Sequence, residues 1–176
     1  MMLTDVNTFD EVVSDAGTDS QQLKIGIVQS CFNLRICQEL ATACLNELDQ
    51  LGICGQNRLV FRVPGALEIP LILQKLTEME QFNALIAIGA IIRGETYHFE
   101  CVANESAAGI MRVQLDTGIP IINAILTTET VRQAKARTDE KGRAAARTAV
   151  EMAALSAMLE QHQRISSNQD NPTGST

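Results

Sequence analysis

The feature that most constrains the fold is an alternation between short apolar runs and segments with helical periodicity. The apolar runs are Lys24–Val28, Leu59–Val63, Ala84–Ile92 and Pro120–Leu126. Within each run the apolar residues follow one another almost without interruption, which is typical of parallel strands covered on both faces. We therefore expect four buried strands in one parallel sheet.

The segments between the runs carry apolar residues at helical spacing. After the first run these are Cys37, Ala41, Cys44 and Leu48, and after the third they are Phe99, Val102, Ala103, Ser106, Ile110 and Val113. A last helix is predicted over Gly142–Gln161, where a series of alanines favours close helix packing. This alternation predicts an α/β fold: a three-layer α-β-α sandwich with right-handed crossovers around a central parallel four-stranded sheet.

The length of 176 residues suits a single domain, which we expect to span residues 23–161. Residues 1–22 carry five acidic side chains and neither Lys nor Arg, and residues 162–176 are mostly polar. Both compositions favour disordered ends: an acidic N-terminal extension and a polar C-terminal tail.

Charge and run length argue against two classes of partner. The formal net charge is −7, so the chain offers no basic surface for nucleic acid. The longest strictly apolar run, Ala84–Ile92, has nine residues, whereas a membrane helix needs about twenty. Five cysteines without a CxxC pair indicate reduced thiols, and no secretory or transit signal is visible, so a cytoplasmic location is expected.

The residues suited to chemistry follow the predicted strands. In an open parallel sheet, ligands bind beyond the carboxyl ends of the strands. The segments at those ends are 30–33 (Ser-Cys-Phe-Asn), 64–68 (Pro-Gly-Ala-Leu-Glu), 93–98 (Arg-Gly-Glu-Thr-Tyr-His) and 127–129 (Thr-Thr-Glu). Because these ends meet at one edge of the sheet, we expect a single ligand site there.

His98 is predicted to lie in the first turn of a helix that starts near Thr96. The free N–H groups and the positive dipole end of such a turn favour phosphate binding, and they favour a neutral imidazole that can accept a proton. The alternative is a structural histidine bonded to the backbone. The position after a strand favours the functional interpretation, whereas His162 is interpreted as a solvated surface residue.

Three further residues have both a functional and a structural interpretation. Glu68 could accept hydrogen bonds from substrate hydroxyls or only complement a helix dipole. Phe32 could belong to the core or form a platform for a flat ring. Cys31 could act as a nucleophile with His98, but no nucleophile elbow accompanies it, so we expect a small buried residue.

A cluster of cations, Arg137, Lys141 and Arg143, is predicted between the last two helices. A solvated turn is the simpler interpretation; a grip on phosphate requires the turn to approach His98, within the chain or across a subunit contact. The sequence contains neither GxxxxGK[ST] nor GxGxxG, and no His/Cys/Asp cluster has metal-ligand spacing. We therefore expect an enzyme without a metal or a cofactor.

Five segments stand in a characteristic order along the chain. They are Ser30-Cys-Phe-Asn33, Val63-Pro-Gly-Ala-Leu-Glu-Ile-Pro70, Gly89-Ala-Ile-Ile-Arg-Gly-Glu-Thr-Tyr-His-Phe99, Val102-Ala-Asn-Glu105 and Ile125-Leu-Thr-Thr-Glu129. They resemble the signature segments of the lumazine synthase family over about residues 23–160. The resemblance implies the penultimate step of riboflavin biosynthesis: condensation of 5-amino-6-(D-ribitylamino)uracil with 3,4-dihydroxy-2-butanone 4-phosphate, which releases phosphate and water.

The resemblance also implies a role for each matching residue. For the ribitylaminouracil it implies stacking on Phe32, binding by Ala66, Leu67 and Glu68 with Glu68 on the ribityl hydroxyls, reading of the uracil edge by Ala90, Ile91 and Ile92, and a pyrimidine contact at Asn123. For the butanone phosphate it implies binding by Glu95 and Thr96, with Arg137 supplied by a neighbouring subunit. His98 matches the proton-transfer residue.

Three features depart from the family pattern. Asn123 stands where many members have an aromatic residue, and Cys31 replaces a commonly basic or small residue. The turn 137–142 is shorter than the Gly/Lys-rich turn common in members that build icosahedral shells. Because family members are built from pentamers with active sites at subunit contacts, we expect a free pentamer, with an icosahedral 60-mer as the alternative.

Other classes of function remain open from the sequence. A hydrolase using Cys31 and His98 on a flavodoxin-like core should lose its activity when Cys31 is replaced by Ala. A non-catalytic flavin or lumazine binder should bind without turnover. A structural shell protein should assemble, although a shell could also be an active enzyme.

Overall fold

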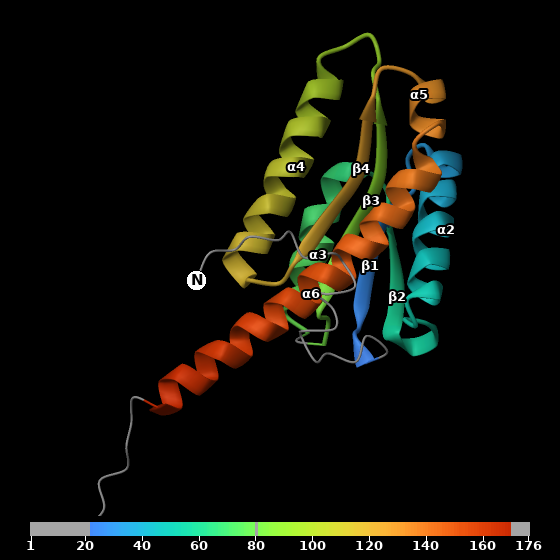
Figure 1. The fold of residues 1–176 in the computed structure, drawn as a ribbon. Coiled ribbons are helices and arrows are strands. Elements are labelled where there is room, and N and C mark those ends of the chain that lie inside the picture. The colour runs from blue at the N-terminus through green and yellow to red at the C-terminus, as the bar shows by residue number, and fades with distance from the viewer. Residues whose placement is uncertain (1–21, 80, 170–176) are drawn as a thin grey trace, which may run out of the picture.

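The computed structural model describes residues 22–79 and 81–169, in which strands and helices alternate along the chain (Figure 1). The strands are β1 (Ile25–Ser30), β2 (Arg58–Val63), β3 (Ala84–Ile92) and β4 (Ile121–Thr128). The helices are α2 (Leu34–Gln50), α3 (Ile69–Thr77), α4 (His98–Thr117), α5 (Val131–Lys135) and α6 (Thr138–Gln169), with 3-10 turns η2 (Gly55–Asn57) and η3 (Ala66–Glu68). The predicted acidic extension, apart from Gln22, and residues 170–176 of the predicted tail lie outside the described residues.

The four strands form one parallel sheet in the order β2-β1-β3-β4. In its register, Ile25 of β1 lies opposite Arg58 of β2 and Ala84 of β3. The predicted parallel four-stranded sheet is confirmed, and β3 has the predicted bounds. All four carboxyl ends lie at the same edge, at the top of Figure 1.

Helices cover both faces of the sheet and enclose two apolar clusters. One cluster joins β1, β3 and β4 to α2 and α6, and the other joins the sheet to α3 and α4. The predicted α2 stripe of Cys37, Ala41, Cys44 and Leu48 is fully in the first cluster. Helix α4 ends where Gly118 adopts a left-handed conformation, with φ of 71°, which suits glycine because it lacks a Cβ.

The prediction that Leu59–Val63 is a buried strand is wrong in its burial. The segment is a strand, but β2 stands at the edge of the sheet, and Leu59 and Val60 are 39% and 40% exposed. The apolar character of a strand does not reveal whether the residues that cover it belong to the same chain. At the other end of the sheet, β4 continues through Thr128, so the Thr-Thr pair predicted to follow the strand belongs to it.

Helix α6 begins at Thr138 rather than at the predicted Gly142 and continues past the predicted end, Gln161, to Gln169. The predicted turn over 137–142 is therefore mostly the first turn of a helix. Gly142 sits so close to α2 that an added Cβ would be 2.5 Å from the Leu40 carbonyl oxygen. The last turns of α6 project beyond the sheet (Figure 1). Within residues 22–79 and 81–169, every helix is too short or too polar to cross a membrane.

Candidate functional site

A cavity of about 480 Å³ opens at the carboxyl edge of the sheet. Its lining comes from the ends of β1 and β3, from η3, and from the first turns of α4. The lining residues are Ser30, Phe32, Gly65, Ala66, Leu67, Glu68, Ala90, Ile91, Ile92, Gly94, Thr96, His98, Phe99 and Val102. The cavity thus collects every predicted site residue except Glu95, Asn123 and Arg137.

Phe32 lies on the cavity wall and is 69% exposed, so it is not part of the core. The turn that carries it is fixed by three hydrogen bonds. The Phe32 N–H donates to Ser30 Oγ at 3.1 Å, the Cys37 thiol donates to the Phe32 carbonyl at 3.2 Å, and Asn33 Nδ2 donates to the Ala90 carbonyl at 2.9 Å. An exposed aromatic ring on a rigid turn can serve as a stacking platform.

Asn33 is a site-building residue that the sequence analysis did not single out. It is the one described residue other than glycine with a positive φ, 54°, a conformation that asparagine tolerates better than most residues. Its side chain ties the β1–α2 turn to the end of β3, where Ala90 lines the cavity. An asparagine directly after a predicted strand is the signal that could have identified it.

Glu68 lies at the end of η3, directly before α3, and its carboxylate borders the cavity. The carboxylate lies over Gly65, where an added Cβ would be 2.9 Å from Glu68 Oε2. Gly65 therefore leaves room for this orientation of Glu68. An exposed carboxylate on a cavity wall can accept hydrogen bonds from ligand hydroxyls.

His98 lies in the first turn of α4, as predicted, although the helix begins at His98 rather than near Thr96. Both residues line the cavity. The free N–H groups of the first turn of α4 lie at the cavity, which suits an anion.

Arg93 connects the three elements that meet beside the cavity. Its Nε donates to Glu129 Oε2 at 2.6 Å, and its NH1 donates to Glu100 Oε1. The Glu100 carboxylate, followed by that of Glu129, raises the pKa of Arg93, and Arg93 in turn lowers the pKa of Glu100. The guanidinium carbon lies 4.1 Å from the centre of the Phe99 ring.

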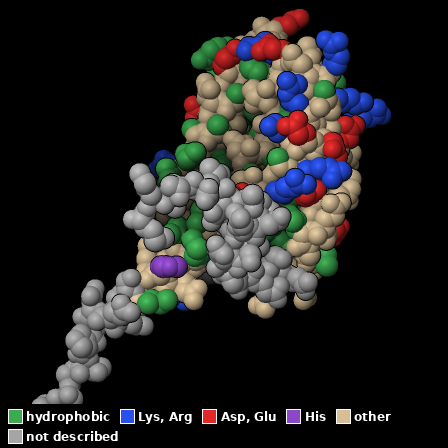
Figure 2. Space-filling model, in the orientation of Figure 1, with side chains coloured by type: hydrophobic (Ala, Val, Ile, Leu, Met, Phe, Trp, Pro, Cys, Tyr) green, Lys and Arg blue, Asp and Glu red, His purple; other side chains and the backbone are tan. Residues whose placement is uncertain are grey.

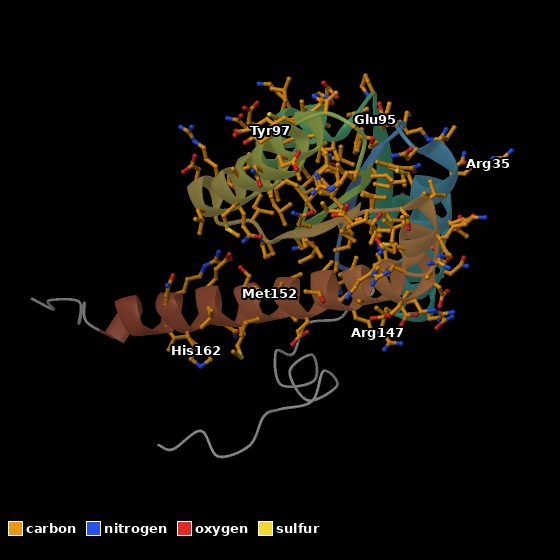
Figure 3. All side chains as sticks on the ribbon, turned by 90° about the horizontal axis from the view of Figure 1, so that it is seen from above. Arg35, Glu95, Tyr97, Arg147, Met152 and His162 are labelled. Atoms are coloured by element: carbon orange, nitrogen blue, oxygen red, sulfur yellow. The ribbon has the colours of Figure 1, made fainter. Side chains whose placement is uncertain are left out.

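Three predicted residues lie outside this chain's cavity. Glu95 is exposed on the loop after β3, at the sheet edge seen from above in Figure 3. Asn123 is exposed on β4, where its Oδ1 accepts a hydrogen bond from the Ile125 N–H at 3.0 Å. Arg137 is exposed between α5 and α6, and its NH1 donates to the Gln133 carbonyl at 2.8 Å.

The prediction that Cys31 is buried is wrong, because this residue is exposed on the turn after β1. Although exposed, Cys31 does not line the cavity that contains His98, so the structure does not assemble the pair that a hydrolase would need. Cys37 is buried, and burial raises the pKa of its thiol to about 11. No group of three or more His, Cys, Asp or Glu within residues 22–79 and 81–169 could hold a metal ion.

The second histidine, His162, lies on the projecting part of α6, far from the cavity (Figure 3). It is exposed, as expected, and its Nδ1 lies 2.9 Å from the Met158 carbonyl oxygen. Lys141 and Arg143 lie in the first turns of α6 and also do not reach the cavity of their own chain.

Comparisons with known proteins give a consistent match. The sequence pattern of the 6,7-dimethyl-8-ribityllumazine synthase family matches residues 22–157. A Paraburkholderia phymatum protein of that name is 64% identical over 143 residues, 81% of this chain and 83% of the relative. Its namesake from Paraburkholderia phytofirmans is 62% identical over 143 residues, 81% and 85% of the two chains. The Burkholderia mallei protein is 64% identical over 139 residues, 79% and 80% of the two chains.

Proposed function

We infer that this chain, which belongs to the 6,7-dimethyl-8-ribityllumazine synthase family, is a transferase. It condenses 5-amino-6-(D-ribitylamino)uracil with 3,4-dihydroxy-2-butanone 4-phosphate to give 6,7-dimethyl-8-ribityllumazine, phosphate and water, the penultimate step of riboflavin biosynthesis. The observation that supports this most is the cavity at the carboxyl edge, which brings Phe32, Glu68, Thr96 and His98 together from three separate segments.

The ribitylaminouracil is proposed to bind at the β1, η3 and β3 side of the cavity. Phe32 offers an exposed ring for stacking on the flat pyrimidine, and Glu68 offers a carboxylate to the ribityl hydroxyls. The cavity wall formed by Ala90, Ile91 and Ile92 offers backbone groups to the uracil edge, and Ala66 and Leu67 line the cavity next to Glu68.

The butanone phosphate is proposed to bind at the start of α4, where Thr96 and the backbone of Glu95 lie before the first turn. The unpaired N–H groups and the helix dipole stabilise an anion there, both in the substrate and in the leaving phosphate. No Lys or Arg among the described residues lines this cavity, and the nearby Arg93 is engaged by two carboxylates. A guanidinium from outside the chain would complete it.

His98 is proposed to transfer protons in the imine formation, phosphate elimination and ring closure. These steps need proton transfer near neutral pH, which an imidazole provides. The remaining rate enhancement comes from holding two reactants together in one cavity. Neither a metal nor a cofactor takes part in this proposal.

We propose that the chain works as a cytoplasmic homo-oligomer, with a pentamer favoured over a 60-mer. Arg137 and Asn123 are exposed and do not line the cavity of their own chain, which suits residues that complete the cavity of a neighbouring subunit. All five cysteines are free thiols, as suits a reducing compartment. Sedimentation analysis distinguishes the assemblies. Arg137→Ala should raise KM for the phosphorylated substrate, and an unchanged KM would exclude this role.

The reaction is tested by mixing purified protein with both substrates and following lumazine absorbance and fluorescence together with phosphate release. The uncatalysed condensation is subtracted. Both products should form in proportion to enzyme, and His98→Ala should slow turnover by about ten- to a thousand-fold. A rate at background would contradict the proposal, and ligand titration of the same sample would then identify a binder. Cys31→Ala should keep its activity, whereas a hydrolase would lose it.

A further inference from the structure

Arg93 stands at the junction of the three elements that form the phosphate side of the cavity. It directly follows β3, and its backbone N–H donates to the carbonyl of Thr128, the last residue of β4, at 3.0 Å. Its side chain reaches Glu129, which follows β4, and Glu100 in the first turn of α4. Arg93 therefore connects the ends of two strands to the start of the helix that begins with His98.

The two carboxylates engage different nitrogens of the guanidinium, Nε for Glu129 and NH1 for Glu100. The face of the same planar group covers the Phe99 ring. These contacts hold both residues that follow His98, and Phe99 itself lines the cavity. Only a planar fork with several donors can make all of them, because a lysine ammonium is a single point charge.

Among the described residues, no side chain caps the start of α4. Its N-cap residue, Tyr97, makes no side-chain capping hydrogen bond, and the loop 93–97 is exposed throughout. The other end of the connection is held in place, since the Glu129 N–H donates to Gln133 Oε1 at 2.9 Å and Thr130 caps α5. Arg93 thus links the segment before α5, which these hydrogen bonds hold in place, to the start of α4, which has no side-chain cap.

The ion pairs of Arg93 contribute little to the stability of the fold. The side chains of Arg93, Glu100 and Glu129 are 39%, 33% and 58% exposed, and ion pairs this open to solvent contribute little to stability. Catalysis is far more sensitive to position, since a misplacement of about 1 Å can cost about a hundred-fold in rate. The contacts of Arg93 therefore matter for the geometry of the site more than for folding.

We propose that Arg93 is a positioning residue for the reaction: through Glu100, Glu129 and Phe99 it sets where His98 and Thr96 stand relative to the rest of the cavity. This inference rests on the proposed condensation. Arg93 does not line the cavity, so its effect is on turnover more than on binding of the ribitylaminouracil, for which Phe32 and Glu68 are the proposed contacts.

The test compares Arg93→Met with Arg112→Met in the lumazine assay. Arg112 is the matched control because it also forms an exposed ion pair on α4, with Asp116 at 3.5 Å, but far from the cavity lining. We expect Arg93→Met to lower kcat about ten- to a hundred-fold while KM for the ribitylaminouracil changes less than about threefold. Arg112→Met should keep wild-type kcat.

Two further variants separate positioning from a general loss of structure. Arg93→Lys should recover only part of kcat, because its ammonium cannot contact both carboxylates and the Phe99 ring together. Ethylguanidinium added to Arg93→Ala should raise kcat, whereas ethylammonium at the same concentration should not. Circular dichroism and the thermal midpoint should match those of Arg112→Met; if Arg93→Met fails to fold, Glu129→Ala carries the same comparison with an expected loss in kcat.

The outcomes distinguish the two levels of the argument. An inactive wild type would overturn the proposed condensation and this inference with it. An active wild type with equal kcat in Arg93→Met and Arg112→Met would overturn the positioning role alone. The positioning role would also fail if Arg93→Lys restored full turnover, or if the loss appeared only as a higher KM for the ribitylaminouracil.

Discussion

The two helical layers differ in how completely a single chain buries their apolar side chains. On the α2/α6 side, small residues bring the helices together, and Ala145, Ala149 and Ala154 of α6 are buried. On the α3/α4 side, α4 buries only a narrow stripe and leaves Met111 and Leu115 more than half exposed. The first layer thus provides the stable support of the sheet, whereas the second provides the site and an open apolar surface of the kind that another subunit covers.

The charges follow the same division. Glu47 on α2 is 3% exposed and is held by two residues of α6, Arg147 at 2.6 Å and Arg143 at 3.2 Å. On α4 the pair between Arg112 and Asp116 is almost fully solvated. Charged side chains of both signs stand beside one another on the side of the molecule where α6 starts (Figure 2). Within the described part of the chain, the one buried carboxylate is therefore Glu47 in the α2/α6 layer.

The largest effect is expected from removing the two arginines that hold Glu47. The double variant Arg143→Met/Arg147→Met leaves the buried Glu47 carboxylate uncompensated, and we expect the free energy of unfolding to fall by about 3–5 kcal/mol. Urea denaturation at pH 7 measures it. Arg112→Met is the control on the open layer and should change stability by less than about 1 kcal/mol. Equal losses in the two proteins would contradict the contrast between the layers.

A smaller effect is expected from adding one methyl group between helices. Gly142→Ala places a Cβ 2.5 Å from the Leu40 carbonyl oxygen and 2.7 Å from the Ala43 Cβ, so backbones must separate. We expect a loss of about 1–3 kcal/mol, as for other overpacked sites.

The counterpart on the open layer is Gly109, where an added Cβ would meet the Pro70 ring at 2.7 Å. The atoms met here belong to a side-chain ring and not to a backbone, so Gly109→Ala should cost less than Gly142→Ala. Thermal melts of both variants, measured together, give the order. A larger loss of stability for Gly109→Ala than for Gly142→Ala would contradict the inference that the α2/α6 layer is the more tightly packed of the two.

The α2/α6 side also contains a buried polar side chain, Gln29, whose replacement should stabilise the fold. Gln29 lies on β1 and, like Ile25 and Ile27, faces the α2/α6 side because alternate residues of a strand share a face. Its Nε2 has no hydrogen-bond partner among the described residues. Gln29→Met removes this buried donor, and we expect a gain of about 1 kcal/mol in urea denaturation. A loss of stability would show that the amide has a partner in solution.

The contrast between the layers also explains what could be predicted from the sequence. Local periodicity was sufficient for β3 and for the α2 stripe, because their cover comes from the same chain. It failed for Leu59 and Val60 on the edge strand, since the sequence of an apolar run is the same whether or not other residues of the chain cover the strand. The rule for carboxyl ends located the cavity, and the family pattern supplied its residues.

The connections that organise the site could not be predicted in this way. Arg93 and Glu129 are 36 residues apart, and Asn33 and Ala90 are 57 apart, so no local spacing links them. Cys31 was expected to be buried because cysteine usually is, but the turn that exposes Phe32 to the cavity exposes its neighbour as well. These contacts arise only when separate strand ends meet in the folded chain.

The smallest perturbation that tests the contrast between the two layers is chemical modification of the five thiols, because it requires no substitution in the chain. Burial raises the pKa of Cys37 to about 11 and that of Cys44 to about 12, so both remain protonated and unreactive towards iodoacetamide at pH 8. Since burial raises the pKa of both thiols above their unfolded value of 9.0, the unfolded chain ionises first, and stability falls as the pH rises from 9 towards 11–12.

The exposed thiols then report on the open layer. Cys101 lies on the same helix, α4, as Met111 and Leu115, whereas Cys54 directly precedes η2, outside the α3/α4 layer. If a neighbouring subunit covers the exposed side of α4, Cys101 should react more slowly than Cys54 in the native protein, and both should react alike in urea. Mass spectrometry of the alkylated peptides gives the rates. Equal native rates would mean that the apolar stripe on α4 stays open in the assembly, so that subunit contacts must form elsewhere.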